Sequence, residues 1–223
     1  MGLVRSGSLD LLVDESSGRE IVETPQLEDR FEDLKKKYKL FLDDDNNPEE
    51  WFLDNIHDVL LPSDINLFLQ QTREYEDHTN YNYTGHFISQ LIQNSYNAGN
   101  NGFELDVNAL KPISYLCSDV SGTEERLVRM IIKGRVGDYC GLDAQHSMFT
   151  IEKARFFCGW YAEHSTFTIW ETKHLCWEGA QHSIFKTHNP EQYKLFRISV
   201  PQNKENKLYL LAADGSILKG GEW

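Results

Sequence analysis

Cysteine and long apolar stretches are both scarce in this chain. Its 223 residues include four cysteines, and none of them has another cysteine within four positions. Structural zinc sites usually pair ligands two to four residues apart, and secreted disulfide-rich domains carry a denser cysteine framework. No apolar run reaches about 18 residues, and the N-terminus lacks the hydrophobic segment of a secretory signal. We therefore expect a reducing, cytoplasmic location.

Positive charge is also in short supply. The chain has 22 Lys and Arg against 35 Asp and Glu, which gives a formal net charge of −13. Such a surface repels phosphate backbones and anionic bilayers, so we expect neither a nucleic acid nor a membrane as partner. The length suits one or two domains and suffices for a hydrophobic core.

Residues 138–187 contain one short motif three times. The copies read DYCGLDAQHSMFTIEKAR, FFCGWYAEHSTFTIWETK and HLCWEGAQHSIFKT. A fixed period of this length, with no helical spacing inside it, is typical of a β-solenoid whose rungs stack in register. Five columns recur at one constant interval: Cys140, Cys158 and Cys176; Ala144, Ala162 and Ala180; His146, His164 and His182; Ser147, Ser165 and Ser183; and Phe149, Phe167 and Phe185.

Each copy ends in a run of β-favouring residues. Side chains alternate between faces along a strand, so Phe149 and Ile151 share one face, which we predict to point inward. A second, shorter strand is predicted to end near Cys140, Cys158 and Cys176. Turns are expected at Gly141 and Gly159, because glycine adopts tight or left-handed backbone at little cost. The third copy has Trp177 there and moves its glycine to Gly179, so its turn is expected to differ.

The string GRVGDYCG at residues 134–141, followed by AQHSMFTIE at residues 144–152, resembles a known glycine-patterned repeat. It is similar to the right-handed β-helix in the C-terminal domain of the glutamate synthase large subunit, which also occurs in a formylmethanofuran dehydrogenase subunit. The resemblance covers roughly residues 127–190, although Cys, Ala and Ser replace most of the family's regular glycines. It implies a non-catalytic, structural element that contacts other domains, and no family catalytic residue has a match here.

The rest of the chain predicts three regions. Residues 1–23 form a leader or a short hairpin around Ser16 to Gly18. Residues 24–99 form a helical region with an amphipathic helix from Pro25, a second helix from Pro48, a third capped by Ser63 or Asp64, and a fourth over 83–96. Residues 100–223 form the solenoid domain. The segments predicted as strands there, outside the repeats, are 103–107, 127–132 and 193–200, followed by a hairpin over 208–218 around Asp214-Gly215 that closes the stack.

The repeated columns allow two chemical interpretations. Thiolate and imidazole suit zinc and iron, which makes the Cys140, Cys158, Cys176 and His146, His164, His182 columns candidate metal ligands. The spacing argues against this, since one residue per rung is typical of a packing column. The His-Ser pairs suggest a nucleophile and base, but neighbouring residues on a strand face opposite ways.

An acyltransferase of the left-handed β-helix type is a further alternative, because the length of one repeat equals three hexapeptides. Glu163 and Gln181 interrupt the aliphatic inward positions that this coil requires.

We therefore predict an α+β chain: an N-terminal helical region, then a right-handed parallel β-solenoid with 18-residue rungs and a C-terminal capping hairpin. The predicted function is a non-catalytic scaffold or subunit that binds a protein partner, with no cofactor, no metal and no catalytic residue. The alternative is an enzyme or metalloprotein that uses the His and Cys columns.

Overall fold

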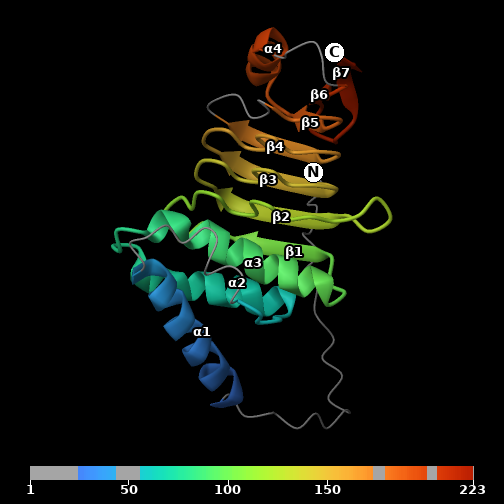
Figure 1. Cartoon of the computed structure of the whole chain (residues 1–223). Coiled ribbons are helices and arrows are strands. Elements are labelled where there is room, and N and C mark those ends of the chain that lie inside the picture. Colours follow the sequence, from blue (N-terminus) through green and yellow to red (C-terminus); the bar gives the residue numbers. More distant parts are fainter. Residues whose placement is uncertain (1–24, 44–55, 173–178, 200–204, 223) are drawn as a thin grey trace, which may run out of the picture.

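Helices and a mostly parallel sheet form a β-solenoid in the computed structural model, which describes residues 25–43, 56–172, 179–199 and 205–222 (Figure 1). The segment predicted as a leader or hairpin, and the start of the helix predicted from Pro48, lie outside these residues. The helices are α1 (Pro25–Asp43), α2 (Pro62–Gln71), α3 (Thr84–Asn97) and α4 (Pro190–Ser199), with short 3-10 turns at Thr72–Tyr75 and Tyr81–Tyr83. The strands are β1 (Gly102–Asp106), β2 (Val128–Arg135), β3 (Ser147–Ala154), β4 (Thr166–Thr172), β5 (Ile184–Thr187), β6 (Lys207–Leu211) and β7 (Ile217–Glu222).

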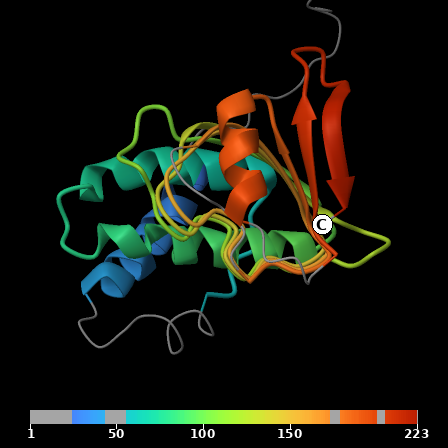
Figure 2. The same ribbon diagram turned by 90° about the horizontal axis from the view of Figure 1, so that it is seen from above.

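The strands lie in the sheet in their order along the chain, from β1 to β7. Each neighbouring pair from β1 to β6 is parallel, and only β6 and β7 are antiparallel. Parallel neighbours need a connection that returns the chain to its starting edge. Viewed from above, the successive connections superimpose on one closed outline, which is the arrangement of a solenoid (Figure 2).

The three phenylalanines of the repeat lie side by side inside the stack. Phe149 pairs with Phe167 and Phe167 with Phe185, and all three are buried. Their rings are parallel, with centroids 4.6 Å and 5.3 Å apart. Met148, on the alternate face, is 37% exposed. The predicted inward face is therefore confirmed.

The shorter strand predicted to end near Cys140 is wrong. Tyr139, Gly141 and Asp143 all have positive φ, of 61°, 68° and 52°, whereas a strand needs a negative φ throughout. This segment is a turn, as predicted at Gly141. After the turn the rungs touch again through isolated parallel bridges at Gln145, Glu163 and Gln181.

Helices α1 to α3 lie at the β1 end of the stack (Figure 1). The predicted stripe of α1 is confirmed, because Phe31, Leu34, Tyr38 and Phe41 are buried. Helix α2 begins at Pro62, two or three residues earlier than a cap at Ser63 or Asp64 predicts, and Leu61 occupies the N-cap position. Helix α3 matches the predicted range 83–96 within a residue. Within the described residues no helix is both long and apolar enough to span a bilayer.

The strand predicted over 193–200 is wrong, because residues 190–199 form α4. The reason lies just upstream, where Asn189 Oδ1 accepts hydrogen bonds from the backbone N–H groups of Glu191 and Gln192 and so caps the helix. Pro190 then occupies the first helical position, where its missing N–H has no cost. The predicted hairpin is confirmed as the antiparallel pair β6 and β7.

Candidate functional site

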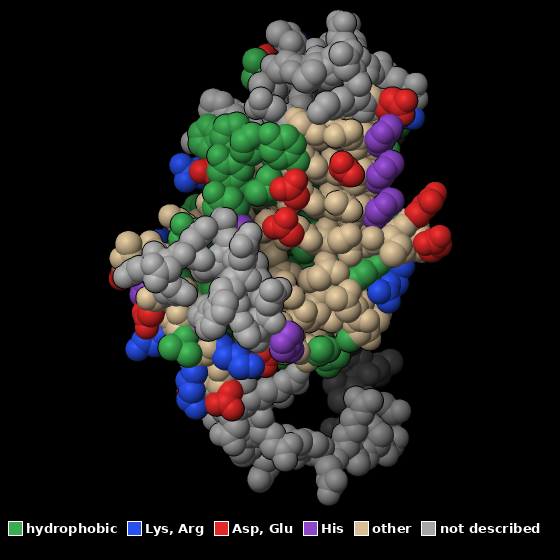
Figure 3. Space-filling model, viewed as in Figure 1, with side chains coloured by type: hydrophobic (Ala, Val, Ile, Leu, Met, Phe, Trp, Pro, Cys, Tyr) green, Lys and Arg blue, Asp and Glu red, His purple; other side chains and the backbone are tan. Residues whose placement is uncertain are grey.

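The histidine column lies on the outside of the solenoid, immediately before each repeat strand. The rings of His146 and His164 are 5.0 Å apart and those of His164 and His182 4.9 Å apart, and both pairs are within 5° of parallel. All three residues have a left-handed backbone, which turns the chain into the strand. His182 Nδ1 lies 2.9 Å from a carboxylate oxygen of Glu205. The column is visible as a line of purple side chains at one edge of the molecule (Figure 3).

The serine next to each histidine points the other way, into the core. Ser165 Oγ donates to the Glu163 and Ala144 carbonyl oxygens and accepts from the backbone N–H of Ser147. Ser183 repeats this pattern one rung further on. The buried hydroxyls thus connect successive rungs while the imidazoles remain outside. The structure therefore does not bring the hydroxyl and ring of a His-Ser pair together.

The cysteine column is buried in the turns. Cys140 and Cys158 are completely buried, as is Cys117 in the preceding turn, while Cys176 lies outside the described residues. Burial, followed by the neighbouring Cys140, raises the pKa of the Cys117 thiol well above its ordinary value, so this group stays protonated. In the described part of the chain, no three His, Cys, Asp or Glu side chains are arranged to hold a metal ion. That the columns bind no metal stays a prediction, since Cys176 is not included.

A set of aromatic side chains covers the outside of the same turns. We call Tyr139, Phe157, Trp160 and Tyr161 the aromatic turn surface. The ring of Tyr139 stacks on Phe157 at 5.2 Å and on Trp160 at 5.3 Å, and Trp160 stacks on Tyr161 at 5.1 Å. Phe157 remains 37% exposed and Tyr161 50% exposed. Figure 3 shows hydrophobic side chains gathered on this side, at the height of β3 and β4.

The Tyr161 ring packs closely against the backbone of the following turn. The Tyr161 ring lies so close to Gly179 that a Cβ there would be 2.1 Å from the ring. Gly179 also has a φ of 79°, so it meets both a steric and a conformational requirement for glycine. This explains why the glycine of the third copy moves to position 179, which is the position of Tyr161 in the second copy.

The stacking continues downward to the helical region. Tyr139 stacks on Tyr115 at 5.1 Å, and Tyr115 stacks on His86 of α3 at 4.5 Å. Tyr115 and Asp119 have the same spacing and the same left-handed backbone as Tyr139 and Asp143, so residues 115–121 form an earlier turn of the solenoid. The aromatic column therefore joins the helices to the repeats.

Carboxylates border the aromatic turn surface. The backbone N–H of Asp119 donates to the carbonyl oxygen of Leu142, and that of Asp143 donates to the carbonyl oxygen of Trp160, each in the following turn. These bonds place Asp119 and Asp143 in the same column as Tyr161. Partial burial and the nearby Glu163 carboxylate raise the pKa of Asp143. Neither Asp143 nor Glu163 has an ion-pair partner among the described residues. The surface is thus apolar, and the Asp143 and Glu163 carboxylates add negative charge at its edge.

Sequence reasoning missed Trp160 and Tyr161, because neither residue recurs in the other copies. The signal was the dense aromatic string FFCGWY at residues 156–161. Inside a turn that carries small residues in the core, such rings have no interior space and must lie outside.

Comparison of the chain with protein-family models, curated proteins and solved structures finds no match. The class of the protein, a β-solenoid with helices α1 to α3 at one end, therefore rests on the strand pairing and the stacked side chains.

Proposed function

We propose that this protein is a non-catalytic β-solenoid scaffold that binds a partner protein through the aromatic turn surface. The observation that carries the proposal is the stack of Tyr139, Phe157, Trp160 and Tyr161, in which Phe157 and Tyr161 are exposed and the other two rings are half-buried. Single exposed apolar residues are normal on a protein surface, but a contiguous group is typical of an interaction site. Trp and Tyr are also the residues most often found at the energetic centre of protein interfaces.

The packing of these rings favours binding. Each ring is held on at least one side by a neighbouring ring about 5 Å away. A preorganised side chain loses little rotamer freedom when a partner covers it, so more of the burial energy contributes to affinity. Covering the exposed parts of Phe157 and Tyr161 removes apolar area from water, at about 25 cal/mol per Å².

The charge around the surface defines the partner's chemistry. Asp143 and Glu163 lie at its edge, and the elevated pKa of Asp143 means that a positive charge placed nearby would stabilise its ionised form. We therefore infer a partner that presents apolar side chains flanked by Lys or Arg. Opposite charges at the rim would raise the association rate more than the affinity.

The finer architecture is part of the same proposal. We infer rungs of 18 residues, because this is the sequence separation of the serines that hydrogen-bond across successive rungs. We also infer a right-handed solenoid, as is usual for parallel crossover connections and as the resemblance to the glutamate synthase β-helix implies. In that family the β-helix contacts other domains and carries no chemistry, which agrees with a scaffold. The β6–β7 hairpin is inferred to cap the stack, because β6 pairs with β5 and its outer neighbour β7 runs antiparallel.

The proposal is tested by affinity capture from the native host with the full chain, quantified by mass spectrometry. Three baits are compared: the unchanged protein, Tyr161→Asn and Trp170→Thr. Asn tolerates the φ of 54° at position 161. Trp170 is the matched control, an aromatic residue 48% exposed that lies on strand β4, outside the aromatic turn surface.

We expect a stoichiometric partner that the unchanged protein and Trp170→Thr retain and that Tyr161→Asn loses. Light scattering of each purified bait shows whether the partner is a second copy of the chain. The proposal is wrong if no partner depends on Tyr161, or if both variants lose the same proteins. Thermal melts verify that all three baits are folded.

A further inference from the structure

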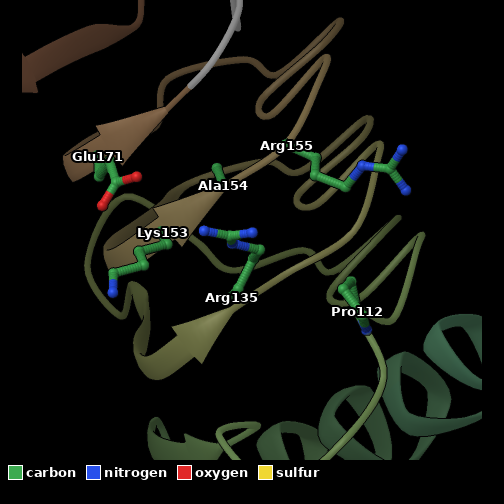
Figure 4. Close-up of a pocket in the computed structure, with 6 residues that line it drawn as sticks. All are labelled: Pro112, Arg135, Lys153, Ala154, Arg155 and Glu171. Atoms are coloured by element: carbon green, nitrogen blue, oxygen red, sulfur yellow. The ribbon is translucent and has the colours of Figure 1, made fainter.

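A pocket of about 200 Å³ lies where strands β2, β3 and β4 end. Figure 4 shows Arg135, Lys153 and Glu171 projecting from the ends of these successive strands, with Arg155 and Pro112 on the opposite side. The lining thus includes three cationic side chains and one carboxylate. Cations thus outnumber carboxylates in the lining, although the chain as a whole has a net charge of −13.

The cations are stacked by the register of the sheet. Arg135 pairs with Lys153 across β2 and β3, and Lys153 pairs with Glu171 across β3 and β4. Like charges directly opposite on adjacent strands destabilise a sheet. The Arg135–Lys153 pair therefore lowers the free energy of unfolding unless a negative charge lies between the two side chains.

The protein's own carboxylates compensate this charge incompletely. Lys153 Nζ lies 3.6 Å from Glu152, and Arg155 Nε lies 3.6 Å from Asp138, which are weak, partly exposed pairs. Glu152 also accepts a hydrogen bond from the backbone N–H of Gly134. Within the described residues Arg135 has no ion-pair partner. The guanidinium of Arg135 is therefore available to an anion in the pocket.

We propose that this pocket binds a phosphate group. Guanidinium groups bind phosphate oxygens through two parallel hydrogen bonds, and a lysine ammonium adds a point charge. A volume of about 200 Å³ accommodates a phosphate but not an extended polyphosphate. Glu171, which lies beside Lys153 in the register of the sheet, repels additional negative charge and so favours a single phosphate. The source is either inorganic phosphate or the phosphate of a small monoester.

The test is calorimetric titration of the full chain at constant ionic strength, with inorganic phosphate in one arm and O-phosphoserine in the other. We expect saturable binding, weakened about tenfold by Arg135→Gln and again by Lys153→Gln, because each removes a charged hydrogen-bond donor. Glu171→Gln is expected to tighten binding about two- to fivefold. The arm with the lower dissociation constant identifies the source.

Arg129→Gln is the matched control, because Arg129 is exposed on the same strand β2 but does not line the pocket. The substitution removes the same charge at a position outside the pocket. Its affinity for phosphate should equal that of the unchanged protein. The proposal is overturned by heats that never saturate, or by equal losses in Arg129→Gln and Arg135→Gln, which would indicate general screening. Weakened or unchanged binding in Glu171→Gln would place the phosphate outside this pocket. All substituted positions are on the surface, and melts without phosphate confirm folding.

Discussion

Phe167→Ala is expected to be the most destabilising substitution in the repeats. The Phe167 ring is fully buried and lies between Phe149 and Phe185, parallel to both. Gly141 and Gly159 pack directly against the Phe167 ring, because a Cβ would lie 2.8 Å from the ring at position 141 and 2.9 Å from it at position 159. The surroundings are therefore filled on four sides and cannot collapse into the space that the ring leaves.

Truncating a buried phenylalanine costs about 3–5 kcal/mol, and the rigid surroundings favour the upper part of that range. For a domain of this size, each kcal/mol shifts the melting temperature by about 2–4 °C, so we expect a loss of about 6–20 °C. Chemical denaturation monitored by circular dichroism gives the free energy directly. Two-state behaviour is checked by the agreement of the two transitions.

The control is Thr166→Ala, on the preceding residue of β4, whose side chain points to the opposite face. This change should cost less than about 1 kcal/mol. Equal losses at positions 166 and 167 would refute the assignment of the inward face. A loss below about 1 kcal/mol for Phe167→Ala would show that the stacked rings do not form a tightly packed core.

Two other predictions concern the end of the stack and its charge. Asn206 Oδ1 accepts a hydrogen bond from the backbone N–H of Ser183, and Asn206 Nδ2 donates one to the carbonyl oxygen of Ala180, both at 2.8 Å. Asn206→Ala should therefore leave two buried backbone groups unsatisfied and lower the free energy of unfolding by about 2–4 kcal/mol. Chemical denaturation measures this loss, which should exceed that of Asp214→Ala in the exposed hairpin turn. Partial burial and Glu163 raise the pKa of Asp143, so the folded state binds the proton more tightly than the unfolded state, and stability falls as pH rises from the unfolded to the folded pKa. Asp143→Asn removes the cost of ionising this carboxyl in the folded state, so it should raise the melting temperature by about 1 °C at pH 7 but not at pH 3. A rise of equal size at both pH values would show that the charge is not the cause.

The strand part of the repeats was predictable because its signal is local and redundant. Five columns recur in one register, and a period of two along a strand determines which side chains share a face. The inward position of Phe149, Phe167 and Phe185 follows from that period together with the apolar residues that share their face. The positions of α1 and α3 were equally predictable, because a stripe of large apolar residues every three or four positions requires a helix with one buried face.

The predictions from sequence were wrong where helix capping and backbone conformation outweigh the side-chain pattern. Residues 193–200 alternate like a strand, yet Asn189 and Pro190 initiate a helix there. The turn containing Tyr139 and Asp143 requires left-handed φ values that sequence pattern does not encode for residues other than glycine, and they are stabilised by hydrogen bonds to the next turn.

The sequence by itself determined the repeat, the stacked columns and the inward face, because each depends on spacing along the chain. Only the tertiary structure decided which residues outside the five repeated columns meet. The aromatic turn surface joins Tyr139 to Trp160 and Tyr161, and the cationic pocket joins Arg135 to Lys153 and Arg155. These groups come from different turns that lie one strand spacing apart, about 4.8 Å, although a whole repeat or more separates some of them along the chain. Their proximity is produced by the winding of the solenoid, which places distant residues next to each other once the strands have paired.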